Sequence, residues 1–285
     1  MADANTTAPV FLFDDAAALA EVVPGSVLRL EGAEGKHALV QRLQVGEPAD
    51  LVDGHGSRAR CVVTGVERNG LSFEVLDIVR EPQPGVSLTL VQALAKGGRD
   101  ELAIETAVEV GVDAIVPWQA DRSIVQWRAD KAAKSKAKWV DAVRAATKQA
   151  RRAFLPPVDD VVNSKQLAKR IEQVVHDGGA AWVLDAGGNV TAATAELPIE
   201  SSCAQSQDPA PTIDSAAPAK ASAQNDSFSA LLVIVGPEGG NSPAELDAFT
   251  KAGAQLVKLG PHIMRTSTAG PIAVSRAAER LGRWG

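Results

Sequence analysis

The sequence predicts an α/β protein in two parts, a small β-barrel or sandwich at the N-terminus and a longer segment with a parallel sheet. Short apolar runs separated by turn signals fill residues 9–80, which is typical of a small β domain. From residue 86 onward strands alternate with amphipathic helices, which is typical of a parallel sheet with helical crossovers. Near the C-terminus, the five aliphatic residues 231–235 run into the glycine-rich turn 236–240, as expected for a buried strand that ends abruptly.

Within the N-terminal part, the turn signals predict which strands pair. Residues 50–52 meet residues 58–64 across the turn at 53–56, and Asn69-Gly70 stands between two alternating apolar runs, a strong hairpin signal. Because only short β runs are visible, we expect this part to be all-β. The sequence Glu-Pro-Gln-Pro-Gly at 81–85 interrupts the pattern and predicts a linker.

The longer part opens with a βαβ unit. A strand is expected at 86–93, a helix at 100–110 that ends at a glycine, and a second strand at 114–117. Between the first strand and the helix lies the segment Lys-Gly-Gly-Arg-Asp at 96–100. This segment is compatible with a phosphate site and, equally, with a tight turn whose charges are solvated.

Residues 128–152 form the most basic stretch, with nine lysine and arginine residues against two aspartates. Trp139, Val143 and Ala146 recur at helical spacing, so we expect an amphipathic helix with a positive outer face. Such a face is often only solvated. Because the whole chain carries a net charge of −6, however, the concentration of positive charge here favours a patch that faces phosphate.

Composition argues against several other classes of protein. Hydrophobic residues make up 45% and charged residues 22% of the chain, as in a globular protein, and neither a secretory signal nor a membrane-spanning run is recognisable. Two distant cysteines, Cys61 and Cys203, and four scattered histidines favour neither a disulfide nor a metal site. We therefore expect a cytoplasmic protein without metal. Residues 201–227, rich in Ala, Ser, Pro, Asp and Gln, are expected to be a disordered insert.

Two loops that contain glycine are expected to meet at the carboxyl edge of the sheet, where open α/β sheets bind ligands. The first loop, residues 236–240, follows the aliphatic strand directly. It leads into a helix that begins with a capping box formed by Ser242 and Glu245, with Pro243 at the first helical position. The helix start therefore holds the first loop at that edge.

The second loop, residues 260–265, follows a strand expected at 255–259. It leads into a last helix that is expected to begin at Ser267 or Thr268. In that case Pro271 falls in the first turn, where its missing N–H costs no hydrogen bond.

Taken together, the two loops are compatible with three kinds of site. The glycines could serve tight turns alone. A dinucleotide site would need the order Gly-x-Gly-x-x-Gly, which residues 236–240 lack, and the charge of Glu238 would repel a pyrophosphate. A site for S-adenosylmethionine fits better, because backbone groups of close-packed loops can bind its adenine and glycines permit that approach.

Further residues fall in the same order as in a known family. These are Lys96, Asp100, 109–112, Pro117, Arg122, Ser123, Trp139, Ala146, Gln149, Arg152, Pro157, 235–240, Leu259, Gly260, Ile263, Arg265, Thr268 and Ala269. In this pattern, which covers nearly the whole chain, the sequence resembles the SPOUT class of RNA methyltransferases. Within that class it resembles the RsmE-type family, which methylates N3 of a uridine in 16S, the small-subunit ribosomal RNA, with S-adenosylmethionine as cofactor.

The resemblance also implies an architecture and partners. Residues 9–80 would form a PUA-like β-barrel that helps to bind RNA. Residues 86–285 would form a SPOUT α/β domain with a C-terminal trefoil knot, a rare exception to unknotted topology. The family works as a homodimer with its site near the subunit interface. The implied substrate is small-subunit ribosomal RNA within the assembled or assembling subunit, and neither a membrane nor a metal takes part.

Individual roles follow from the resemblance as well. Arg265 is expected to stabilise negative charge that develops on a uracil carbonyl, and Glu238 to order its loop or to accept the proton from N3. The residues expected to bind the cofactor are Leu184, Gly236, Pro237, Glu238, Gly239, Gly240, Leu259, Gly260, Ile263, Met264 and Thr268. Those expected to bind RNA are Arg29, Lys96, Arg122, Arg144 and Arg152.

The chain departs from the family pattern in two places. Ser267 stands where the family has a glutamate, so the side chain can still cap a helix but can no longer pair with a cation. The insert at 201–227 is longer than the family needs. Two alternative functions stay open: a SPOUT enzyme that acts on tRNA or large-subunit ribosomal RNA, and a non-catalytic RNA-binding protein. The intact glycine loops disfavour the second alternative.

Overall fold

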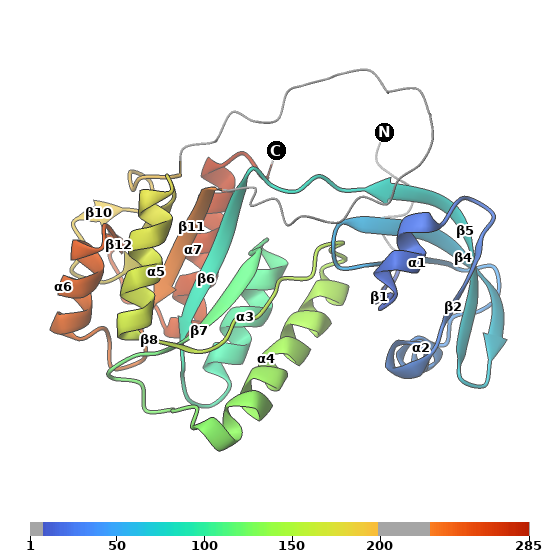
Figure 1. Ribbon diagram of the computed structural model, residues 1–285, viewed down its shortest axis with the longest axis horizontal. Coiled ribbons are helices and arrows are strands. Elements are labelled where there is room, and N and C mark those ends of the chain that lie inside the picture. The colour runs from blue at the N-terminus through green and yellow to red at the C-terminus, as the bar shows by residue number, and fades with distance from the viewer. Residues whose placement is uncertain (1–7, 199–228, 285) are drawn as a thin grey trace, which may run out of the picture.

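The computed structural model describes residues 8–198 and 229–284, which form two sheets joined by the segment 81–85 (Figure 1). The disordered insert predicted at 201–227 lies outside the described residues. The N-terminal sheet is built from residues 10–80 and the C-terminal sheet from residues 86–258. The change from one kind of sheet to the other therefore occurs where the sequence predicts the linker.

Five strands form the N-terminal sheet. They are β1 (Val10–Leu12), β2 (Val27–Leu30), β3 (Pro48–Val52), β4 (Ser57–Glu67) and β5 (Gly70–Arg80). Their order is β1-β3-β4-β5-β2, with β1 and β3 parallel and the other neighbours antiparallel. The hairpin predicted at Asn69-Gly70 is confirmed, because Glu67 pairs with Gly70. β1 and β2 are the two edges of this order, so closure into a barrel stays a prediction.

Two short helices, α1 (Ala16–Glu21) and α2 (Gly32–Val40), also belong to the N-terminal part, so the prediction that it is all-β is wrong. α1 begins where the Asp15 carboxylate accepts a hydrogen bond from the backbone of the first turn. Both helices are too short to repeat an apolar period in the sequence. They depend on packing instead, because Leu19 and Ala38 are buried in the core of this sheet.

Seven strands form the C-terminal sheet, and each is parallel to its neighbours. They are β6 (Val86–Ala93), β7 (Ala114–Gln119), β8 (Val162–Asn163), β9 (Ala180–Leu184), β10 (Val190–Thr191), β11 (Ser229–Val235) and β12 (Gln255–Lys258). Their order is β10-β12-β9-β11-β6-β7-β8, which confirms the predicted parallel sheet. Because β12, β9 and β11 are neighbours, their carboxyl ends lie side by side.

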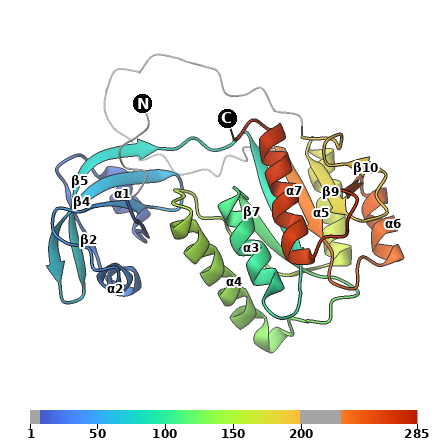
Figure 2. The same cartoon turned by 180° about the vertical axis from the view of Figure 1, so that it is seen from behind.

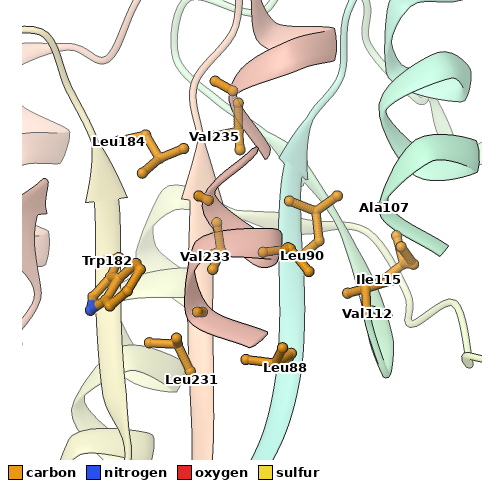
Figure 3. Packing of buried hydrophobic residues seen from close by; sticks show 14 of the residues in the cluster. Leu88, Leu90, Ala107, Val112, Ile115, Trp182, Leu184, Leu231, Val233 and Val235 are labelled. Atoms are coloured by element: carbon orange, nitrogen blue, oxygen red, sulfur yellow. The ribbon is translucent and has the colours of Figure 1, made fainter. Parts of the chain in front are cut away.

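Helices cover both faces of this sheet. They are α3 (Arg99–Glu109), α4 (Ala129–Gln149), α5 (Ser164–His176), α6 (Pro243–Lys251) and α7 (Thr266–Arg280). α5 and α6 lie on the near face in Figure 1, and α3, α4 and α7 on the near face in Figure 2. Strand β11 is buried on both sides: Leu231, Val233 and Val235 pack toward α3 and α7 (Figure 3), whereas Leu232 and Ile234 pack toward α5 and α6.

The starts of the last two helices test the predicted caps. The capping box of α6 is confirmed: Ser242 Oγ accepts from the N–H of Glu245 at 3.1 Å, and Glu245 Oε2 accepts from the N–H of Ser242 at 2.7 Å. α7 starts earlier than expected, with Arg265 at the N-cap and no side chain capping it. The prediction that Pro271 lies in the first turn is therefore wrong. It lies inside the helix, which lacks one hydrogen bond there.

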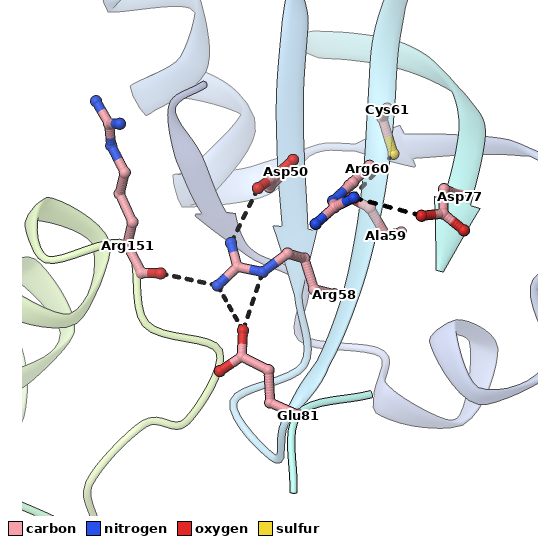
Figure 4. A network of polar contacts seen from close by, with 8 residues as sticks. All are labelled: Asp50, Arg58, Ala59, Arg60, Cys61, Asp77, Glu81 and Arg151. Atoms are coloured by element: carbon pink, nitrogen blue, oxygen red, sulfur yellow. Dashed lines mark hydrogen bonds and ion pairs between the residues drawn. The ribbon is translucent and has the colours of Figure 1, made fainter. Parts of the chain in front are cut away.

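Polar contacts join the two sheets beside the linker (Figure 4). The Arg58 guanidinium on β4 donates to Asp50 Oδ2 at 2.9 Å, to Glu81 Oε1 at 2.8 Å and to the backbone oxygen of Arg151 at 2.8 Å. Lys148 near the end of α4 donates to the carboxylate of Glu34 on α2 at 2.9 Å. Part of the basic face of α4 is thus used to hold the N-terminal sheet.

Candidate functional site

The carboxyl ends of β9, β11 and β12 open into a cavity of about 600 Å³. Residues 236–241 form its first wall and residues 259–264 its second wall, as the two glycine loops predict. The predicted site residues that line the cavity are Leu184, Gly236, Pro237, Glu238, Gly240, Leu259, Gly260, Ile263, Met264 and Arg265. Gly239 and Thr268 are not part of its lining.

At the root of the first wall, Gly236 is packed against a side chain. A Cβ at this position would lie 2.5 Å from Asn241 Oδ1, closer than real Cβ contacts, so any other residue would displace the Asn241 side chain. The Asn241 amide Nδ2 in turn donates to the Leu184 backbone oxygen at 3.3 Å. Asn241 therefore ties the turn after β11 to the end of β9, and the close approach requires the glycine.

Glu238 is held by the loop that precedes α3. Its Oε1 accepts from the N–H of Lys96 and from the Arg99 guanidinium, both at 3.1 Å. Burial raises the pKa of Glu238, but hydrogen bonds from its own N–H and from Lys96 and the charge of Arg99 outweigh burial, so the pKa lies below its ordinary value. The carboxylate is ionised near neutral pH and is a weak proton acceptor, which favours the ordering role over the role of a base.

Arg122 fixes the far end of the same wall. Its Nη1 donates to the backbone oxygens of Gly239 and Asn241, both at 3.1 Å. Arg122 was also expected to bind phosphate. Its side chain is exposed, so a phosphate contact in addition to the contact with the wall stays a prediction. Gly239, although outside the cavity lining, is thus part of the wall's support.

A buried relay connects the first wall to the start of α7. Gln92 on β6 is fully buried, and its Nε2 donates to Thr266 Oγ1 at 2.8 Å. Thr266 Oγ1 donates to the backbone oxygen of Gly236 at 3.0 Å. Because 174 residues separate Gln92 from Thr266, no local pattern in the sequence could reveal the pair. The relay fixes the backbone next to Arg265.

The second wall is open by comparison. Within the described part of the chain, residues 260–264 make no hydrogen bond to any other residue, and Ile263 is 88% exposed. Arg265 follows directly: its backbone oxygen accepts from the N–H groups of Thr268 and Ala269 at 2.9 Å, while its exposed guanidinium has no ion-pair partner among the described residues. The guanidinium is therefore available to a ligand.

Sequence reasoning missed several residues of the lining. These are Arg99, Asp185, Ala186, Val235, Asn241, Val257, Lys258, Pro261, His262, Thr266 and Ala269. A signal existed for Lys258, which stands near the end of the strand predicted at 255–259, where side chains reach the binding edge of a parallel sheet. Asp185 directly follows β9. With Glu238, Arg99 and Arg265, they give the cavity charges of both signs.

The other predicted RNA contacts lie outside the cavity. Arg29 is a surface residue, 66% exposed, 3.5 Å from Glu67, and Lys96 reaches the first wall through its backbone. Arg144 pairs with Asp14 at 3.2 Å. Arg152 is mostly buried and donates to the backbone oxygens of Val108 and Val112, a structural role in place of the expected phosphate contact.

Three observations bear on whether S-adenosylmethionine fits this cavity. Its volume lies within the range of small-molecule sites. A Cβ at Gly260 would meet no atom within 4 Å, so this glycine keeps space open beside the second wall. Carboxylates and cations both line the cavity, which suits a zwitterion that also carries a sulfonium charge. The residues present therefore fit this cofactor.

The described residues contain neither a metal-binding cluster nor a membrane-spanning helix. In residues 8–198 and 229–284, no three His, Cys, Asp or Glu side chains are grouped so that they could hold a metal ion. Over the same ranges, no helix has the length and apolarity needed to cross a membrane.

Comparisons with known proteins agree with this geometry. The RNA methyltransferase domain family matches residues 81–278. A protein from Mycobacterium tuberculosis named ribosomal RNA small subunit methyltransferase E is 38% identical over 261 residues, which cover 91% of this chain and 89% of that protein. One of the same name from Bacillus subtilis is 28% identical, covering 86% of this chain and 87% of that protein.

A solved structure of a similar protein contains a bound ligand. It is the crystal structure of a ribosomal RNA small subunit methyltransferase E from Neisseria gonorrhoeae bound to S-adenosyl methionine. The two sequences are 25% identical, the TM-score is 0.71, and the match covers 96% of this chain and 98% of that one.

Proposed function

On the premise that this chain belongs to the RNA methyltransferase family, among the small-subunit ribosomal RNA methyltransferases E, we propose a reaction for it. The protein transfers a methyl group from S-adenosylmethionine to N3 of a uridine in small-subunit ribosomal RNA. The observation that carries the proposal is the cavity at the carboxyl edge of the sheet, with two glycine-bearing walls and charges of both signs. A protein that only binds RNA has no use for such a cavity.

S-adenosylmethionine, when bound, supplies an electrophilic methyl group. Asn241 and Thr266 keep the first wall in place beside it, and Gly260 leaves open space beside the second wall. Asp185 offers a carboxylate on the cavity surface to the cofactor's positive charge. These residues orient the cofactor and do not react, which is the main contribution a protein makes to such a transfer.

Arg265 acts on the uracil. Neutral N3 is a poor nucleophile, so its proton must pass to water before the N3–methyl bond forms and the sulfonium–methyl bond breaks. A guanidinium beside a uracil carbonyl oxygen stabilises the resulting anion, lowers the pKa of the N3–H group and so favours attack. Arg265 suits this role because its backbone is anchored while its side chain is without an ion-pair partner among the described residues. Glu238, ionised and held by Arg99, keeps the first wall in its shape.

The same proposal includes the finer architecture: a PUA-like barrel in residues 9–80, a knotted SPOUT domain in residues 86–285, a homodimer and a place in the cytoplasm. Ile263 is exposed on the second wall, and Leu102, one turn after Arg99 on α3, is 52% exposed. Apolar side chains around a site are the kind of surface that a second copy of the chain covers. This exposure supports the dimer.

The test is methyl transfer from labelled S-adenosylmethionine to three substrates: small subunits from cells that lack this protein, naked small-subunit ribosomal RNA, and bulk tRNA. We expect label in 3-methyluridine of the small-subunit RNA. Label on tRNA alone would keep the enzyme and overturn the substrate. No transfer and no heat of cofactor binding in calorimetry would leave only an RNA-binding protein.

A further inference from the structure

Six helices of the described chain are followed, after the C-cap residue, by a residue in the left-handed backbone conformation. Four of these residues are glycines, Gly111, Gly178, Gly253 and Gly282. The other two are arginines: Arg42 after α2, with φ 59°, and Arg151 after α4, with φ 56°. Within the described residues, only these two side-chain-bearing residues have a positive φ.

An arginine is an unfavourable choice at this position. The left-handed conformation brings Cβ close to the following backbone, so helices that end this way normally use glycine or asparagine. A cation does interact favourably with the negative end of the helix dipole, but it can do so from any position in the last turn without backbone strain. The dipole alone therefore does not account for arginine at these two positions.

Both arginines have a fixed backbone and a free side chain. The N–H of Arg151 donates to the Lys148 oxygen at 3.1 Å, and its own oxygen accepts from Arg58 at 2.8 Å. Arg42 is held likewise, by the Leu39 oxygen at 3.0 Å and by Gln44 Nε2 at 2.9 Å. Both are exposed, and in the described chain neither guanidinium has a hydrogen-bond or ion-pair partner.

The cations around Arg151 are used differently. Arg144, Lys148 and Arg152 all contact acidic groups or backbone oxygens. The guanidinium of Arg151 instead points away from the Arg58 network (Figure 4). The charge of Arg151 interacts electrostatically with the Asp50 carboxylate, but that carboxylate accepts its hydrogen bond from Arg58 and not from Arg151. At the end of the basic stretch, Arg151 is thus the cation left available to a partner.

We propose that Arg42 and Arg151 contact phosphates of the substrate RNA. This inference rests on the proposed function. Phosphate contacts supply most of the electrostatic affinity for RNA, and a protein with a net charge of −6 must make them at selected points. A side chain presented from a fixed backbone loses less freedom on binding than one on a mobile loop. The contacts carry no sequence information and serve to position the RNA.

The test measures the Kd for naked small-subunit ribosomal RNA as a function of salt for Arg42→Gly, Arg151→Gly and the double variant. Each phosphate contact that is lost should make the slope of log K against log salt less steep, by roughly 0.7 to 0.9. If the variant and the wild type bind equally at about 1 M salt, the variant should bind about sixfold more weakly at about 0.1 M salt. Because glycine favours the left-handed conformation, thermal unfolding should occur at the wild-type temperature or slightly above it.

Lys251→Ala is the matched control, since it removes one exposed cation from α6, where Asp247 already pairs with it. Its salt slope should equal that of the wild type. Wild-type slopes in both glycine variants would overturn the proposal, and so would a loss seen only with whole subunits, which would indicate contact with a ribosomal protein. Failure of the proposed function would instead appear in the wild type, as absent methyl transfer.

Discussion

The first wall of the cavity, residues 236–241, is fixed by contacts from several other elements, whereas residues 260–264 of the second wall make no hydrogen bond within the described chain. Lys96 and Arg99 hold Glu238, Arg122 holds the oxygens of Gly239 and Asn241, and Thr266 holds that of Gly236. Both walls follow a parallel strand and contain glycine, so the difference lies in their support.

This difference separates two requirements of a transferase. A wall that is fixed before the ligand arrives binds without a further ordering cost and holds the cofactor in one orientation. A wall without internal ties can move to admit and release ligands. At its end, the side chain of Arg265 can adjust to the base from an anchored backbone. The fixed wall should therefore govern cofactor affinity, and the open wall the chemistry.

The largest expected effect is that of Arg265→Ala, which should lower kcat by about 10²–10³-fold because a charge-stabilising donor is lost. The cofactor Kd should stay near that of the wild type, since the first wall is untouched. Single-turnover transfer and calorimetry measure the two quantities. Arg265→Lys keeps the charge but not the planar guanidinium, so its kcat should lie between that of the wild type and that of Arg265→Ala. Turnover at the wild-type rate would remove Arg265 from the chemistry.

The two glycines of the walls offer a matched pair. In Gly236→Ala, the new Cβ meets Asn241 Oδ1, which should lower the free energy of unfolding by about 1–3 kcal/mol and weaken cofactor binding. In Gly260→Ala the Cβ meets nothing within 4 Å, and the free energy of unfolding should change by less than about 0.5 kcal/mol. Denaturant titration compares them. Equal losses would contradict the assigned difference between the walls.

Thr266→Val keeps the shape of the side chain but removes the hydroxyl that joins Gln92 to Gly236. We expect a loss of about 1–2 kcal/mol in the free energy of unfolding, because a buried donor and acceptor each lose a partner. Thr266→Ser should recover most of it. If serine and valine behave alike in thermal unfolding and cofactor binding, the relay is not what holds the first wall.

The smallest expected effect concerns Glu238 and pH. Its pKa is lower in the folded than in the unfolded chain, so ionisation stabilises the fold; this contribution is complete above the unfolded pKa and is lost as the pH falls through the folded pKa. The wild type should therefore exceed Glu238→Gln in stability near neutral pH, and the difference should vanish once the pH falls below the folded pKa. A difference that is constant with pH would place its origin elsewhere.

Local signals in the sequence predicted local structure well. Ser242 and Glu245 cap α6 because both partners lie within one turn, and the Asn69-Gly70 hairpin needs only its own backbone. Trp139 and Val143 are buried on α4, as their spacing predicts. Each of these features depends on residues a few positions apart.

What depends on distant contacts could not be predicted. Arg152 was expected to bind phosphate, but its partners Val108 and Val112 lie 40 or more residues away. α7 starts at Thr266, whose hydroxyl accepts a hydrogen bond from the distant Gln92, and this start places Pro271 inside the helix. The sequence therefore located the two walls but not the side chains that support one of them.

Amide hydrogen exchange with and without S-adenosylmethionine tests the difference between the walls most directly. We predict that the Gly240 amide of the first wall, which donates to the Pro237 oxygen at 2.9 Å, exchanges slowly in the free protein and changes little on binding. Residues 259–264 should exchange fast in the free protein and become protected only when the cofactor is present. Equal protection of both walls in the free protein, or a larger change in residues 236–241, would contradict the account.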